Sequence, residues 1–173
     1  MIPATAYISE TCRLYIAVLF LFSAGGKALS FREFEKTVTE SMSFPPWGSR
    51  YIAGAVIVAE ALGAFLSLMS GTAARLGVSL ALFLSIIFAG FVTTMLVQGK
   101  SVRCNCFGQT NESLSSLDLL RNGFMIAACV FYLLSISSGI HTTIAYLLLL
   151  AMAVIALLIT ANLKSIPGLL RVE

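Results

Sequence analysis

The chain has 173 residues, of which 58% are hydrophobic and only 11% are charged, and its formal net charge is +3. Soluble domains carry about 25% charged residues, so the few charged side chains of this chain cannot cover a domain surface in water. The composition therefore excludes a soluble enzyme, a disordered chain and a nucleic-acid binder, and it predicts a surface that faces lipid.

Five apolar segments follow one another along the chain, and each approaches the roughly 20 residues that a membrane-spanning helix needs. They cover residues 7–29, 51–70, 76–97, 117–135 and 142–163. We expect the first to remain as an anchor and not to be a cleaved leader, because no basic region precedes it. Residues 1–173 are thus predicted to form one integral membrane domain. Its fold class is an all-α polytopic helical bundle with a four-helix core and a fifth transmembrane helix.

The connections between these segments differ in length and chemistry. The links after the second and the fourth segments are short and predict antiparallel neighbouring helices. The link 30–50 contains the sequence FREFEKTV, which we expect to form a short helix at the interface. Pro45 and Pro46 should end that helix and place Trp47 at headgroup depth. The loop 98–116 is polar and follows the third segment.

Basic residues are distributed unevenly between the two sides of this predicted bundle. The side of loop 98–116 holds most of the Lys and Arg residues, whereas the other side holds only Arg13 and Arg75. Short loops rich in Lys and Arg stay in the cytoplasm. The charge distribution therefore predicts that loop 98–116 is cytoplasmic.

A C-x-C pair, Cys104 and Cys106, is the main chemical signal, and it lies in that polar loop. Positive charge favours the reactive thiolate, and Arg103 is adjacent to the pair. A disulfide between residues two apart closes a small strained ring, which suits exchange better than structure. Phe107 could anchor the loop to the bilayer, and Gly108 would permit a sharp turn.

Redox exchange is the preferred interpretation of this pair, with metal binding and ordinary reduced cysteines as the alternatives. A thiolate of Cys104 or Cys106 would attack a partner disulfide, and the second cysteine would resolve the mixed disulfide. Cys12 and Cys129 lie in apolar segments, where free cysteine acts as a small hydrophobe. We expect both of these cysteines to serve packing only.

Five polar residues inside the apolar segments are candidates for supporting or structural roles. A carboxylate such as Glu60 is costly in a membrane, so it is either a proton-handling or quinone-facing group or part of an interhelical hydrogen bond. Lys27 is its candidate partner. Asp118 and Arg121 share a helix face and predict an ion pair. Alternatively, Arg121 could hold a thiolate or a quinone carbonyl, with Asn122 donating a hydrogen bond inward.

The chain resembles the methylamine utilisation protein MauE family, within the broader DoxX-like group of redox-associated membrane proteins. The resemblance rests on Gly26-Lys27, Glu60, Cys104-Asn105-Cys106-Phe107-Gly108 and Arg121-Asn122. It implies a small membrane bundle that works with a thioredoxin-like partner on protein disulfides. Cys104 and Cys106 would then be the exchanging pair, and Lys27, Glu60 and Arg121 would be supporting polar positions.

The expected partners are membrane lipid and either a thioredoxin-like protein or a disulfide-bearing client, with no nucleic acid. No cofactor is assigned, although a membrane quinone is one possible electron acceptor. The expected location is the bacterial cytoplasmic membrane. The resemblance implies oxidative chemistry on the outer face, which conflicts with the cytoplasmic loop that the charges predict.

Two other functions stay open at this point. The chain could be a carrier of soft metals such as Cu(I), Zn(II) or Hg(II), with the two thiolates as ligands. Met95 and Met125 are the best further ligands that the sequence offers for such a path. The chain could also be a structural membrane subunit with incidental cysteines.

Overall fold

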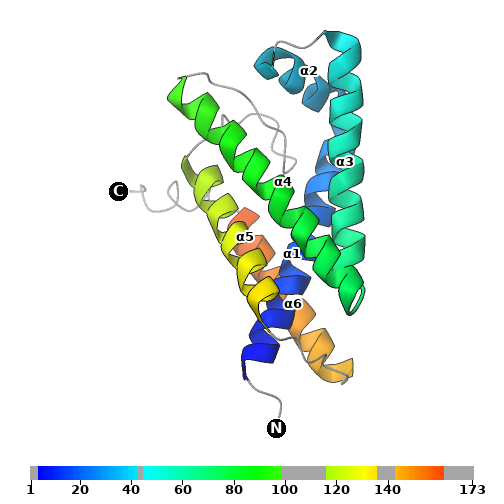
Figure 1. Cartoon of the computed structure of the whole chain (residues 1–173), viewed down its shortest axis with the longest axis vertical. Coiled ribbons are helices and arrows are strands. Elements are labelled where there is room, and N and C mark those ends of the chain that lie inside the picture. The colour runs from blue at the N-terminus through cyan, green and yellow to red at the C-terminus, as the bar shows by residue number, and fades with distance from the viewer. Residues whose placement is uncertain (1–3, 43–44, 99–115, 136–142, 162–173) are drawn as a thin grey trace, which may run out of the picture.

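The computed structural model describes residues 4–42, 45–98, 116–135 and 143–161, and six helices account for nearly all of them (Figure 1). The helices are α1 (Ala4–Leu29), α2 (Phe31–Met42), α3 (Pro46–Leu68), α4 (Thr72–Val97), α5 (Ser116–Leu134) and α6 (Thr143–Ala161).

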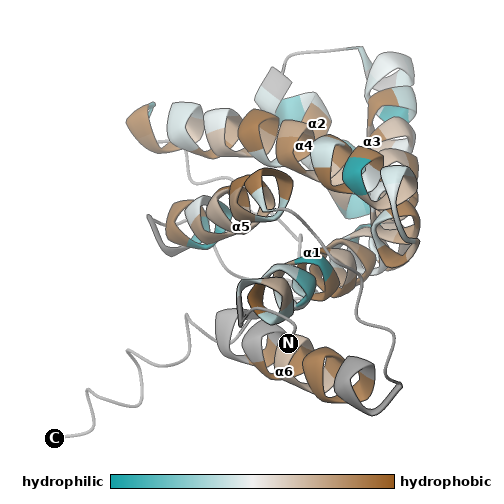
Figure 2. Ribbon diagram, turned by 60° about the horizontal axis from the view of Figure 1, so that its bottom comes forward, coloured by the Kyte–Doolittle hydropathy of each residue, from teal (hydrophilic) through white to brown (hydrophobic). Residues whose placement is uncertain are grey.

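Helix α1 is the centre of the bundle, since it contacts each of the other five helices. The main core forms where α1, α3, α4 and α5 meet. Its buried members are Ile16, Leu19, Phe20, Ala64, Ala74, Val78, Ala81, Met125, Cys129 and Tyr132. Helix α6 packs against α1 on the side away from α4 (Figure 2) and supplies none of these residues. The expected four-helix core with a fifth long helix beside it is therefore confirmed.

The distribution of side chains is that of a membrane protein. Many large apolar side chains are exposed on the outer helix faces, including Phe65, Phe83 and Leu148. By contrast, Arg13 and Lys27 are almost fully buried, which reverses the rule for soluble proteins. By length and composition, three helices of the described residues could cross a membrane, namely α1, α3 and α4. The protein is an integral membrane protein.

Helix α3 differs in detail from the apolar segment that predicts it, whereas α1 agrees with its segment. Helix α3 begins at Pro46, ahead of the apolar run from Tyr51, because proline is well tolerated in the first turn of a helix. The polar turn after Pro46 is therefore helical although it is not apolar. Helix α1 continues through Gly25 and Lys27 to Leu29 without a break.

The segment FREFEKTV is helical, as predicted, and belongs to α2, which follows α1 almost directly. Phe34 and Val38 of α2 pack on Ala53 of α3, while Lys36 and Glu40 lie exposed as an ion pair at 3.7 Å. Hydrophilic turns mark α2, whereas hydrophobic residues dominate α4 (Figure 2). Helix α2 thus covers one end of α3 with an apolar face.

Helices α3 and α4 approach each other closely beside the short turn that joins them. Gly71 in that turn has a φ of 68°, which glycine adopts without strain. A Cβ atom on Gly77 would lie 2.5 Å from the backbone nitrogen of Ser67 and 2.8 Å from the carbonyl carbon of Leu66. Only a residue without a side chain fits at Gly77, as is common where membrane helices pack.

We predict that Gly77→Ala lowers the thermal stability of the protein in detergent, because the added methyl group must push α3 and α4 apart. Overpacking costs about 1–3 kcal/mol, which corresponds to at least about 2 °C in Tm for a chain of this size. Gly90→Ala is the matched control on the same helix, since its Cβ would meet nothing within 4 Å. Equal Tm values for the two variants would contradict the close helix contact.

Candidate functional site

A buried ion pair joins α1 to α3. The Lys27 ammonium donates to Glu60 Oε1 at 2.5 Å and to the Ser23 hydroxyl at 2.7 Å. The Ser23 hydroxyl in turn lies 3.5 Å from Glu60 Oε1. Lys27 is 2% exposed and Glu60 is 9% exposed. The partner that the sequence suggested for Glu60 is the one that the structure brings to it.

Two aromatic rings also lie near the ammonium group. Lys27 Nζ lies 5.7 Å from the ring centre of Phe34 and 6.0 Å from that of Phe88. These distances suit cation–π attraction, which strengthens when the cation is desolvated. Helices α1, α2, α3 and α4 thus all contribute a group to the environment of one charge.

A small polar cavity of about 40 Å³ adjoins the ion pair. Its polar lining consists of Ser23, Lys27, Glu60, Ser85, Arg121 and Asn122, and its apolar lining includes Leu19, Phe20, Leu84, Phe88 and Met125. A single water needs about 10–15 Å³ of such volume and two to four polar partners. The cavity therefore has room for a few water molecules. Of the supporting residues predicted from the sequence, Lys27, Glu60, Arg121 and Asn122 all line it.

Two residues that line this cavity each have a buried polar atom without a hydrogen-bond partner among the described residues, namely Glu60 at Oε2 and Asn122 at Nδ2. One is an acceptor and the other is a donor, and an unmade hydrogen bond in such surroundings costs about 1–3 kcal/mol. The cavity therefore offers complementary polar groups to water or to a small polar ligand.

The predicted ion pair on α5 is present, with Arg121 Nη2 3.5 Å from Asp118 Oδ1. Arg121 is about 7.5 Å along the helix axis from Ser116, the first residue of α5. Helices α4 and α5 end and begin at the same end of the bundle (Figure 1). The cavity therefore lies toward the end where residues 98–116 join the two helices.

A larger and mostly apolar groove of about 170 Å³ lies on the other side of the ion pair, between α2, α3 and α4. Phe34, Val38, Ile52, Val56, Ile87 and Phe91 line it together with Thr37. The groove and the cavity have four lining residues in common, namely Lys27, Glu60, Leu84 and Phe88. The ion pair thus borders both spaces.

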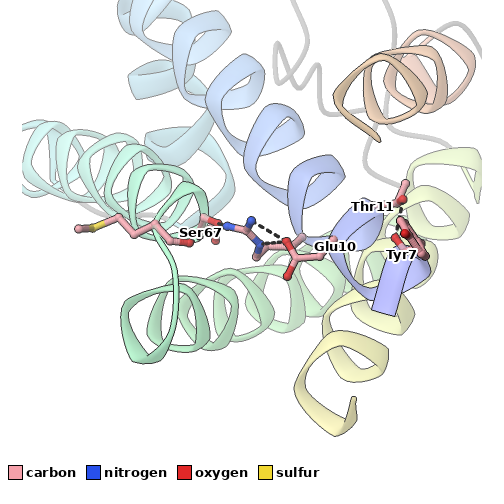
Figure 3. Close-up of polar contacts among 6 residues, drawn as sticks. Tyr7, Glu10, Thr11 and Ser67 are labelled. Atoms are coloured by element: carbon pink, nitrogen blue, oxygen red, sulfur yellow. Dashed lines mark hydrogen bonds and ion pairs between the residues drawn. The ribbon is translucent and has the colours of Figure 1, made fainter. Parts of the chain in front are cut away.

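A second ion pair lies toward the opposite end of α1 and has a structural role. Arg13 contacts Glu10 through Nε at 2.8 Å and Nη2 at 2.6 Å. It also donates through Nη1 to the carbonyl oxygens of Ser67 at 2.7 Å and Met69 at 2.6 Å. Figure 3 shows the Glu10 carboxylate and Ser67 facing each other across these bonds. Arg13 thus satisfies carbonyl groups at the end of α3, which a helix leaves unpaired.

The C-x-C segment of the predicted site, with Cys104, Cys106, Arg103, Phe107 and Gly108, lies outside the described residues. Cys129 packs in the main core, and Cys12 is half-buried on α1.

Potential metal ligands do not gather in the part of the chain that the structure describes, where no group of three His, Cys, Asp or Glu side chains could hold an ion. Met95 and Met125 are both buried, and Met125 belongs to the main core. Cys129 follows Met125 by four residues on α5, and both side chains belong to the main core.

Sequence reasoning did not identify Ser23, Phe34, Ser85 and Phe88 as part of the site. Ser23 precedes Lys27 by four residues and therefore lies on the same face of α1, which is a signal that could have found it. The other three come from helices whose rotation toward α1 depends on packing, so no local pattern indicates them.

Comparison with protein families gives a match that covers most of the chain. The family described as methylamine utilisation protein MauE matches residues 5–135. This range runs from the second residue of α1 to just beyond the end of α5, and it includes both members of the buried ion pair and the C-x-C segment. Comparisons with curated proteins and with solved structures give no match.

We predict that Lys27→Met and Glu60→Gln each destabilise the protein, because each leaves one buried charge or polar group without its partner. Breaking a buried pair from one side costs about 3–5 kcal/mol. The double variant should regain a large part of that loss, and thermal unfolding of the four proteins in detergent measures the coupling.

The exposed pair Lys36–Glu40 provides the matched control, with Lys36→Met, Glu40→Gln and the double variant. Pairs of this kind are worth about 0–1 kcal/mol, and its two members are 76% and 64% exposed. Coupling in the buried pair no larger than in this control would contradict the geometry described for Lys27 and Glu60.

Proposed function

The chain belongs to the methylamine utilisation protein MauE family, and on this premise we propose that it is a membrane thiol–disulfide exchange protein. It acts either by itself or as an accessory to a thioredoxin-like oxidoreductase. The exchanging groups are the thiols of Cys104 and Cys106.

The observation that carries this proposal is the position of the C-x-C segment in the chain relative to the polar cavity. The segment connects α4 to α5, and both helices line the cavity through Ser85, Arg121 and Asn122. The chain thus enters the segment from one helix that lines the cavity and leaves it into another. Arg103 beside the pair and Lys100 nearby favour the thiolate form.

The exchange proceeds by two displacements that conserve electrons. A thiolate of Cys104 or Cys106 attacks one sulfur of the partner disulfide, which forms a mixed disulfide and releases one partner thiolate. The second cysteine then attacks the mixed disulfide, which yields the Cys104–Cys106 disulfide and a partner dithiol. The reverse sequence oxidises the partner, and the relative reduction potentials determine the direction.

The proposed partners are a thioredoxin-like protein or a client protein that carries a disulfide, together with the lipid around the bundle. The proposed location is the bacterial cytoplasmic membrane, with loop 98–116 on the cytoplasmic side. Burial leaves the excess of Lys and Arg on the loop side in place, because each side loses a cation to a buried pair. Lys27 is paired inside the bundle on the loop side, and Arg13 is paired on the opposite side. Among the described residues, the exposed cations Arg32, Lys36 and Arg50 remain on the loop side, against Arg75 on the other side.

We predict that the Cys104–Cys106 pair forms a reversible disulfide in the purified full chain. A Cys12→Ala, Cys129→Ala background isolates the pair, and maleimide gel shifts after equilibration with dithiothreitol buffers measure its oxidation. Because the small disulfide ring is strained, the midpoint reduction potential of the pair should lie above the roughly −300 mV of structural disulfides. Adding Cys104→Ser and Cys106→Ser should abolish the transition. A pair that stays reduced in every buffer would refute the proposed exchange.

The side of the loop is tested by labelling intact cells with a membrane-impermeant maleimide, in the same background and after mild reduction. We expect labelling only after the membrane is opened, because the exposed Lys and Arg residues favour a cytoplasmic loop. Labelling in intact cells would place the pair on the outer face and would overturn the predicted orientation.

A further inference from the structure

The groove between α2, α3 and α4 has the size of a site for one six-membered ring. Its volume is about 170 Å³, and an engineered apolar cavity of about 150 Å³ is sufficient to bind benzene. The polar cavity on the other side of the ion pair, at about 40 Å³, takes only water. A ring-containing ligand therefore fits the groove and not the cavity.

The groove is bordered by a matched donor and acceptor. Lys27 has three N–H donors, and the structure gives hydrogen bonds for two of them, to Ser23 and Glu60. Glu60 Oε1 is engaged, whereas Oε2 is buried without a partner among the described residues. A ligand that both accepts and donates a hydrogen bond would satisfy both groups. Apolar rings, including Phe34 and Phe88 beside the ammonium, would contact the body of such a ligand.

The groove opens within the membrane-spanning part of the bundle. Ile87, one of its lining residues, is 53% exposed, and it lies ten residues before Val97, the end of α4. At a rise of 1.5 Å per residue this is about 15 Å from the helix end, which is well inside a hydrocarbon layer about 30 Å thick. A ligand can therefore reach the groove from lipid.

We propose that this groove binds the ring of a membrane quinone, with its isoprenoid chain directed toward lipid. Lys27 donates to an oxygen of the ring, and Glu60 Oε2 accepts from the hydroxyl group of the reduced form. The reduced form, a neutral lipid-soluble ring with two hydroxyl groups, meets all three requirements: ring size, a donor and acceptor on one molecule, and entry through lipid. The oxidised form meets the first and the third and accepts a hydrogen bond from Lys27.

The redox role of this site rests on the proposed function, whereas binding does not. When the thiols of Cys104 and Cys106 become a disulfide, two S–H bonds break and one S–S bond forms. The two electrons and two protons released reduce one quinone, whose two carbonyl oxygens become hydroxyl groups. The quinone would then be the oxidant that regenerates the Cys104–Cys106 disulfide after a client has reduced it.

The test uses the purified full chain in detergent with decylubiquinone as the probe, and saturable binding is followed through the rise in Tm with ligand concentration. Binding is measured in the Cys104→Ser, Cys106→Ser variant as well, so that it does not depend on thiol chemistry. We expect saturable binding in both proteins. If binding holds but the cysteine pair never titrates, this site stands and the proposed exchange fails.

Val56→Trp should weaken binding at least tenfold, because the indole fills the groove without altering the ion pair. Val58→Trp is the matched control, since Val58 is 66% exposed and does not line the groove. Glu60→Gln and Lys27→Met should also weaken binding where they fold. Equal binding by the Val56 and Val58 variants would indicate partition into the micelle and overturn the proposal. Displacement of the probe by dodecanoic acid at equal concentration would assign the groove to fatty acids and overturn it too.

Discussion

The requirement that a charge inside a membrane must have a partner determines how this bundle is built, and the bond between Lys27 and Glu60 is its clearest expression. A lone charge at such a depth is strongly unfavourable, so α1 and α3 must align where these two side chains meet. The same requirement accounts for Glu10 with Arg13 and for Asp118 with Arg121. Two of the three pairs use α1, which is also the helix that contacts all the others.

The ion pair also separates two spaces of different chemistry. On one side lies a polar cavity that extends to α5, and on the other lies an apolar groove toward lipid. Lys27 and Glu60 border both spaces, so a ligand or proton bound in either space acts on the same ion pair. A proton or a ligand that alters the charge of Glu60 would thereby affect the contacts of α5, whose first turns follow the C-x-C segment.

Much of the architecture could be predicted from the sequence, because apolar length alone indicates membrane helices and helices occupy all five predicted segments. The family was identified from Gly26-Lys27, Glu60, the C-x-C-F-G segment and Arg121-Asn122, and its match over residues 5–135 confirms it. Helix α3 begins ahead of the predicted apolar segment 51–70, since its first turn is polar and only proline at its start indicates a helix. The depth of Lys27 relative to Glu60 depends on how α1 slides along α3, and no local pattern encodes that.

The spacing of the ion pair along the chain has a consequence for biogenesis. Lys27 precedes Glu60 by 33 residues, and a ribosome adds about 5–20 residues per second. The lysine therefore leaves the ribosome some seconds before the carboxylate that neutralises it. During this interval its long side chain can extend to the bilayer surface, with α1 seated shallowly. Arrival of α3 then draws the ammonium inward, so the final depth of the first helix is reached only after the third has been inserted.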